Sequence, residues 1–169
     1  IEDKYQLKPP RPFAPGGEVA GEVIGVGEGV TGWAEGDRLI ALTGFGGLAE
    51  RIAVPAAMAF KLPANRDFTA GAALLMTYAT TIHALVDRGE AKAGERLLVL
   101  GASGGIGLSA IEIGKALGLT VVAAVSSEAK AEAARAAGAD EVLIYPAGAI
   151  DKAASKALAG AFKAAAGPN

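Results

Sequence analysis

The sequence has no cysteine, a single histidine and few aromatic residues, and the missing cysteine excludes two kinds of site. Without cysteine, these residues can form neither a disulfide framework nor a thiolate zinc site. A formal net charge of −2 leaves no basic surface for nucleic acid, and no apolar run reaches the length of a membrane-spanning helix. We therefore expect no nucleic-acid partner and no membrane association.

The first residues also lack the features of a secretory signal. Glu2, Asp3 and Lys4 carry charge, and no apolar core follows them. Together with the absence of cysteine, this predicts a cytoplasmic protein.

Glycine is abundant, and one glycine cluster is the most informative feature of the chain. A short apolar run from Leu97 to Leu100 is followed by four glycines and then by a helical pattern over 108–117. The four glycines are Gly101, Gly104, Gly105 and Gly107. Strand, tight turn and helix N-terminus in this order form a site for a nucleotide phosphate, because the free N–H groups and the helix dipole attract anions.

The residues around the cluster support this interpretation. A β-rich run over 120–125 and a second helix over 128–137 follow, and then come a third strand over 141–145 and a helix over 150–166. Gly118 and Gly138 stand where left-handed helix caps belong. This βαβαβ order predicts half of a Rossmann sheet. We expect its first helix to turn one apolar face to the sheet, formed by Ile106, Ala110, Ile113 and Leu117.

The residues before 90 follow a different pattern. Short alternating runs separated by glycine turns predict an antiparallel, barrel-like β domain. The predicted strands span 18–26, 38–42, 48–54 and 59–62. A helix over 69–86 follows, with apolar side chains at helical spacing at Leu74, Leu75, Tyr78 and Ile82. We expect this helix to bridge two domains, residues 1–90 and 91–169.

Several ordered motifs resemble one family over nearly the whole chain. They are KPPRPFAPGGEVAG at 8–21, GEGV at 27–30, GDRL at 36–39, GGLAE at 46–50, YATTIHAL at 78–85, the glycine cluster, and GADEV at 138–142. Together they resemble the medium-chain dehydrogenases/reductases, and within them the zinc-independent NADPH:quinone oxidoreductase (zeta-crystallin-like) branch. The fold class implied is α/β, with a partial GroES-like antiparallel β domain followed by a partial Rossmann parallel sheet with flanking helices.

The resemblance also implies a longer protein. Members of this family have further strands before the segment at 8–21, and the second half of the Rossmann sheet follows a helix like that at 150–166. We therefore expect this chain to carry the adenosine half of a cofactor site and only part of the nicotinamide half. Relatives are commonly dimers, which implies a homodimer here.

The family pattern also bears on metal binding. Zinc-dependent relatives have a histidine before the glutamate of a Gly-His-Glu motif, whereas this chain has Gly17 before Glu18. We therefore expect no metal site. We interpret Glu18 as a structural carboxylate rather than a general base, and His83 as a packed or capping residue rather than a catalytic one.

The end of the second Rossmann strand indicates which cofactor is bound. NAD sites place an acidic residue there, which would repel a 2′-phosphate, but this chain has Val125-Ser126-Ser127. In the family resembled, the serine, lysine and tyrosine that match Ser126, Lys130 and Tyr145 hold the 2′-phosphate of NADPH. Lys130 could instead be an ordinary solvated lysine paired with Glu128 or Glu132.

The remaining predicted cofactor contacts are Ser103, Gly104, Gly105 and Ile106 in the glycine turn and Thr80, which matches the family threonine at the nicotinamide end. Thr80 could equally be a helix threonine bonded to its own turn. Family members contribute further polar side chains from a segment upstream of Ile1, so we name no catalytic residue.

The resemblance implies NADPH-dependent hydride transfer to a quinone or an alkene conjugated to a carbonyl, without a metal. Two other classes of protein are alternatives to this interpretation. The short-chain dehydrogenases share a similar glycine pattern, but they need a Tyr-x-x-x-Lys pair, and here Tyr5, Tyr78 and Tyr145 are followed four residues later by Pro9, Ile82 and Ala149. The second alternative is an NADPH-binding structural or regulatory module without activity, because a fold does not fix a function.

Overall fold

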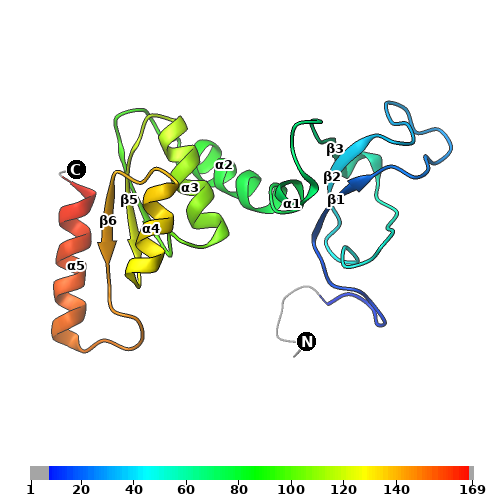
Figure 1. Ribbon diagram of the computed structural model, residues 1–169. Helices are drawn as coiled ribbons and strands as arrows, with labels where there is room; N and C mark the ends of the chain where they lie inside the picture. Colours follow the sequence, from blue (N-terminus) through cyan, green and yellow to red (C-terminus); the bar gives the residue numbers. More distant parts are fainter. Residues whose placement is uncertain (1–7, 168–169) are drawn as a thin grey trace. The chain divides into compact units, whose positions relative to one another are not determined.

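The computed structural model describes residues 8–167, which form two compact units (Figure 1). The first unit ends at Met76 and the second begins at Thr77. The boundary therefore lies within the helical stretch that was predicted to belong to the first domain, and this stretch contributes residues to both units.

The first unit is built on an antiparallel sheet of three strands: β1 (Glu18–Glu22), β2 (Arg38–Leu42) and β3 (Ala59–Lys61). A single turn of 3₁₀ helix, η1 (Ala56–Met58), precedes β3, and α1 (Phe68–Ala72) packs on the sheet. The side chain of Asp67 caps α1 by accepting a hydrogen bond from the N–H of Ala70 at 2.6 Å. The core of this unit is small, and its most buried apolar side chains include those of Ile40 and Leu62.

Two of the strands predicted for this unit differ in the structure. Residues 48–54 form no strand, and β1 ends at Glu22 rather than at residue 26. A strand is stable only when its backbone groups find a partner, and no strand among residues 8–167 pairs with 48–54. Beyond Glu22, Val23 still makes backbone hydrogen bonds with Gly36 and Asp37, and the chain then reaches a turn in which the N–H of Val30 donates to the carbonyl of Gly27.

The predicted helix over 69–86 is helical but irregular. After α1, residues Leu75–Ala79 (η2) and His83–Arg88 (η3) form π-helical turns on either side of the short α2 (Thr80–Ile82). A π turn holds more residues than an α turn, so the face that a 3.6-residue period predicts drifts away from the interior. Ile82 is accordingly 46% exposed, and the neighbouring Thr81 is buried instead.

The second unit is an α/β layer that confirms the predicted Rossmann half. Strands β4 (Arg96–Leu100), β5 (Thr120–Val125) and β6 (Glu141–Ile144) are parallel, in the order β4-β5-β6. The helices are α3 (Gly105–Ala116), α4 (Glu128–Ala136) and α5 (Lys152–Ala166). Val121, Ala123 and Val125 of the central β5 form one core with Ile111 of α3 and with Ala131 and Ala134 of α4.

The predicted sheet-facing side of α3 was partly wrong. Its buried residues are Gly107, Ser109, Ala110, Ile111 and Gly114, whereas Ile106 is 46% exposed. A Cβ at Gly114 would lie 2.9 Å from a methyl group of Val121, so glycine is what allows this close approach. The small residues Gly107, Ser109, Ala110 and Gly114 therefore face the sheet together with Ile111, whereas Ile106 does not.

The ends of these helices match the prediction. Gly118 and Gly138 adopt left-handed backbone angles, with φ of +78° and +102°. Among the helices of residues 8–167, none combines the length and the apolar character needed to cross a membrane.

Candidate functional site

The glycine turn joins β4 to α3 and forms the first part of the site. Gly101 has a φ of +62°, which only glycine adopts without strain, and its carbonyl accepts a hydrogen bond from the N–H of Gly104 at 3.0 Å. Ala102 is fully buried and donates its N–H to the carbonyl of Ala124 on β5. The turn is therefore fixed to the carboxyl end of the sheet.

Close contacts restrict side chains at two of the glycines, and the tighter one, at Gly107, is with backbone. A Cβ at Gly107 would lie 2.6 Å from the Cα of Ala102, and one at Gly105 would lie 3.0 Å from the Cγ2 of Thr77. The backbone at Gly104 and at Gly105 is exposed. The turn therefore forms a cradle of exposed backbone, and side chains at these glycine positions would fill the space that a ligand could occupy.

The start of α3 supplies the positive potential. Gly104 occupies the N-cap position with an extended backbone, and no side chain caps the helix there. The first N–H groups of an α-helix have no partner within the helix, so those of α3 can bind an anion. The cradle and the helix N-terminus together fit the pyrophosphate of a dinucleotide.

The second part of the site lies at the carboxyl ends of β5 and β6. Val125 and Ile144 are paired in the parallel register, and the N–H of Tyr145 donates to the carbonyl of Val125 at 2.9 Å. Ser126 and Tyr145 thus each directly follow the last paired residue of their strand. Since alternate strand residues point to opposite faces and Val125 faces α3 and α4, this alternation places Ser126 and Tyr145 on the other face.

Lys130 reaches the same end of the sheet from the first turn of α4. Its Nζ lies 2.8 Å from the Oγ of Ser126, and its N–H donates to the Oγ of Ser127, which caps the helix. The structure therefore brings Ser126 and Lys130 into direct contact. Glu128 is paired with Arg135 at 2.6 Å, so the alternative pairing of Lys130 with Glu128 is not the one observed.

Thr80 begins α2, and its side chain is exposed. Its carbonyl accepts a hydrogen bond from the N–H of His83, as in an ordinary helix turn. The buried hydroxyl in this turn belongs to Thr81, which lies 2.7 Å from the hydroxyl of Ser109 on α3. The role of Thr80 remains a prediction.

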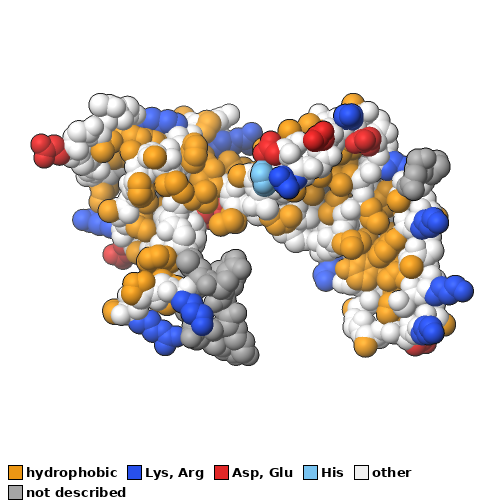
Figure 2. Space-filling view, turned by 180° about the vertical axis from the view of Figure 1, so that it is seen from behind, with side chains coloured by type: hydrophobic (Ala, Val, Ile, Leu, Met, Phe, Trp, Pro, Cys, Tyr) orange, Lys and Arg blue, Asp and Glu red, His pale blue; other side chains and the backbone are white. Residues whose placement is uncertain are grey.

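The residues considered for metal binding are engaged elsewhere. Glu18 accepts a hydrogen bond from the N–H of Met76 at 3.0 Å, which is a structural contact. The Nδ1 of His83 lies 2.9 Å from Asp87, and both side chains are largely exposed, so His83 is not packed. It occupies the C-cap position of α2, and its imidazole lies on the surface (Figure 2). Within residues 8–167, no three histidine or acidic side chains gather closely enough to hold a metal ion.

Tyr78 and Glu112 form a contact that the sequence analysis missed. The phenol donates a hydrogen bond to the carboxylate across the gap between η2 and α3. This bond, with the partial burial of the ring, raises the pKa of Tyr78 above its usual value of 10.0. Tyr78 therefore acts as a donor and stays protonated at neutral pH. No spacing rule predicts this pair, because the two residues are 34 positions apart.

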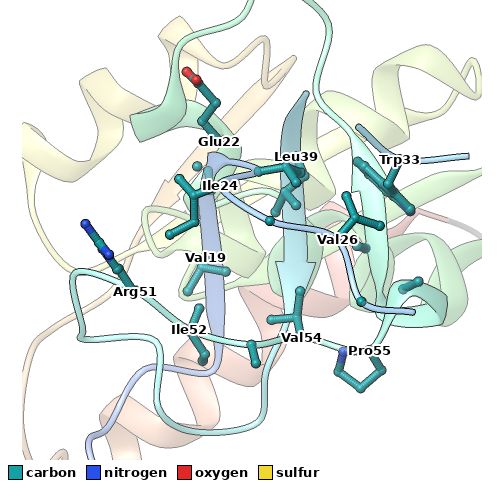
Figure 3. Close-up of a pocket in the computed structure, with 18 of the residues that line it drawn as sticks. Val19, Glu22, Ile24, Val26, Trp33, Leu39, Arg51, Ile52, Val54 and Pro55 are labelled. Atoms are coloured by element: carbon teal, nitrogen blue, oxygen red, sulfur yellow. The ribbon is translucent and has the colours of Figure 1, made fainter. Parts of the chain in front are cut away.

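Two cavities are lined by residues of the first unit. One cavity, of about 520 Å³, lies between β1 and the segment 49–56. Figure 3 shows Val19, Ile52 and Val54 among its apolar walls. A second cavity of about 570 Å³ is lined by 42–46, 52–55 and Met58. None of the predicted cofactor contacts lines either cavity.

Comparison with known proteins assigns a known domain to the first unit and finds relatives that match most of the chain. The family model of the alcohol dehydrogenase GroES-like domain matches residues 1–64. A quinone oxidoreductase of Rattus norvegicus is 41% identical over 139 residues, which are 82% of this chain and 42% of that protein. The chain thus spans less than half the length of the curated relatives of this kind.

Two solved structures are similar over nearly the whole chain. A probable oxidoreductase from Mycobacterium abscessus has a TM-score of 0.80 and 41% identity, over 94% of this chain and 50% of that one. The Escherichia coli quinone oxidoreductase complexed with NADPH has a TM-score of 0.76 and 31% identity, over 92% of this chain and 48% of that one.

A GroES-like antiparallel sheet followed by a parallel nucleotide-binding sheet defines a class of two-unit α/β proteins. Within that class, the chain belongs to the medium-chain dehydrogenase/reductase family, in its quinone oxidoreductase branch. The resemblance drawn from the sequence motifs is therefore confirmed.

Proposed function

We propose that this chain is part of an NADPH-dependent oxidoreductase that transfers a hydride to a quinone or to an alkene conjugated to a carbonyl, without a metal. The observation that carries the proposal is the contact of Lys130 with Ser126 at the end of β5, where no carboxylate stands. The ammonium group of Lys130 and the hydroxyl of Ser126 favour binding of a 2′-phosphate, whereas a carboxylate at this place would repel it. The similarity to the NADPH complex of the Escherichia coli protein supports the same cofactor.

The residues of this chain would bind and orient the cofactor. The bare backbone of Ser103, Gly104, Gly105 and Ile106 and the N–H groups of α3 hold the pyrophosphate. Ser126, Lys130 and Tyr145 hold the 2′-phosphate, and Thr80 contacts the nicotinamide end. NADPH supplies the hydride, and the protein supplies orientation and the exclusion of water.

The absence of a metal ligand set is part of the proposal. Glu18, which follows Gly17, is bonded to the backbone of Met76, and the sequence contains no cysteine. Reduction of a quinone or an enone requires only that the acceptor lie against the nicotinamide while a donor stabilises the developing oxyanion. We infer a small-molecule acceptor, a homodimer and a cytoplasmic location from the same family membership.

The experiment is NADPH binding by calorimetry together with NADPH oxidation in the presence of a panel of quinones and enones. Binding with turnover, unchanged after chelation with EDTA, is the expected result. Tight binding without turnover of any acceptor would favour the alternative of a non-enzymatic NADPH-binding module. An equal preference for NADH would contradict the proposed cofactor.

A further inference from the structure

Tyr145, at the end of β6, contacts an aromatic side chain from the last helix. The rings of Tyr145 and Phe162 of α5 meet edge to face, with centroids 6.3 Å apart and planes at 82°. This geometry is favourable for aromatic pairs, because the positive edge of one ring meets the negative face of the other. Both residues are half-buried.

The helix that carries Phe162 is held at both ends. Asp151 caps its N-terminus by accepting a hydrogen bond from the N–H of Ala154 at 2.7 Å. At the other end, Arg96 of β4 donates its Nε–H to the carbonyl of Ala165 at 2.9 Å and pairs with Glu141 of β6 at 2.8 Å. The guanidinium of Arg96 therefore links the end of α5 to β4 and β6.

The backbone of Tyr145 is fixed by its hydrogen bond to Val125, but this bond leaves the ring free to rotate. An aromatic side chain at a strand end can occupy several rotamers unless a neighbour selects one. Phe162 is such a neighbour, because it packs on the ring from the face of the sheet opposite α3 and α4. That is the face on which strand alternation also places Ser126.

We propose that Phe162 is a positioning residue that fixes the ring of Tyr145 beside Ser126 and Lys130, so that α5 contributes to recognition of the 2′-phosphate. This inference rests on the proposed function, which assigns Ser126, Lys130 and Tyr145 to that phosphate. Phe162 itself does not contact the cofactor. Its effect on binding is therefore confined to nucleotides that carry the phosphate.

The test uses adenosine 2′,5′-bisphosphate and AMP, which share the adenosine and the 5′-phosphate and differ in the 2′-phosphate. Dissociation constants are measured by calorimetry on the full chain and on the F162A variant. We expect F162A to raise the Kd of the bisphosphate about fivefold and to leave that of AMP unchanged. The F162Y variant, which keeps an aromatic ring, is expected to restore the wild-type ratio.

Two further variants separate positioning from simple loss of stability. Leu158 is another half-buried residue of α5, and L158A is expected to lower the melting temperature without changing the ratio of the two constants. If F162A does not fold, F162L keeps the apolar bulk without the ring and is measured in its place. In a Y145A background, the change at Phe162 is expected to have no further effect on bisphosphate binding.

Equal weakening of both ligands, or an unchanged ratio in F162A and F162L, would overturn the inference and leave the proposed function standing. A wild-type chain that binds the bisphosphate no better than AMP would instead overturn the assignment of the 2′-phosphate site. The two failures are thus distinguishable.

Discussion

The hydroxyl groups of Thr81 and Ser109 lie 2.7 Å apart in the interior of the second unit. Both residues are almost fully buried, with exposed fractions of 2% and 1%. Ser109 also donates toward the carbonyl of Ile106, one turn earlier in α3, at 3.0 Å. This hydrogen bond therefore holds α2, which carries Thr80, against α3, the helix that begins at the glycine turn.

We expect S109A to lower the free energy of unfolding by about 1 to 2 kcal/mol, because it leaves the buried hydroxyl of Thr81 without this partner. The double variant T81V/S109A removes both hydroxyls and is expected to cost about 1 kcal/mol less than the sum of the single changes. Urea unfolding of the four proteins measures this coupling. Strictly additive losses would show that the hydroxyls do not interact.

The two glycines at positions 107 and 160 lie in helices but differ in their surroundings. G107A is expected to lower the free energy of unfolding by about 2 kcal/mol, because the new Cβ would meet the Cα of Ala102 at 2.6 Å. At Gly160 of α5 the new Cβ would meet no atom within 4 Å, and G160A is expected to raise stability by roughly 0.5 to 1 kcal/mol. Thermal unfolding of both variants tests the prediction, and equal effects at the two positions would contradict it.

Removal of the charge at Lys130 is expected to weaken NADPH binding selectively. A charge-assisted hydrogen bond to a phosphate is lost in K130M, so the Kd of NADPH rises about tenfold while that of NADH stays the same. K156M, which removes an exposed lysine of α5, is the matched control and is expected to change neither constant. Calorimetric titrations give both values, and a parallel loss of NADH affinity in K130M would argue against a phosphate contact.

A carboxylate at position 126 is expected to reverse the preference. S126D places a negative charge where the 2′-phosphate is proposed to lie, and it offers acceptors to the ribose hydroxyls of NADH. The ratio of the Kd of NADPH to that of NADH is expected to rise at least tenfold, compared with a small change in S126A. Unchanged selectivity in S126D would place the phosphate elsewhere.

Asp140 makes stability depend on pH. The hydrogen bond from Lys115, with one from the N–H of Val121, lowers the pKa of this carboxyl below its ordinary value of 3.8. A carboxyl with a lowered pKa stabilises the folded state above the unfolded pKa, and this contribution is lost as pH falls through the folded value. We therefore expect the melting temperature to fall below about pH 4, and to fall less in D140N.

The variant K115M removes the main cause of this shift and is the companion to D140N. It is expected to reduce the same acid dependence by raising the pKa of Asp140 toward its ordinary value. Melting curves recorded from pH 7 down to pH 3 compare the three proteins. Identical acid dependence in all three would show that Asp140 and Lys115 do not interact in solution.

The local features of the Rossmann half follow from the sequence because their causes are local. The positive φ angles at Gly101, Gly118 and Gly138 require glycine, and the apolar run at 120–125 is typical of a strand buried on both faces. The order of strand, turn and helix then leaves one right-handed arrangement for parallel strands. The candidate phosphate cradle could therefore be predicted from one short stretch.

Only the tertiary structure decided which faces and partners these segments use. Hydrophobicity alone predicted that Ile106 faces the sheet, whereas in the structure Gly107 packs against Ala102 of the turn and Gly114 against Val121 of β5. Residues 48–54 have a strand-like pattern but no strand to pair with among the described residues. Periodicity also assumed regular α turns, and the π turns of η2 and η3 shift the buried position to Thr81.

The sequence by itself determined the family, the glycine turn and the absence of an acid at the end of β5, because these depend on residue type and order. The tertiary structure decided that Phe162 packs on Tyr145 and that Tyr78 bonds to Glu112. The physical reason is distance along the chain. Contacts such as that between Tyr78 and Glu112 join residues 34 positions apart, and only packing determines which side chains meet.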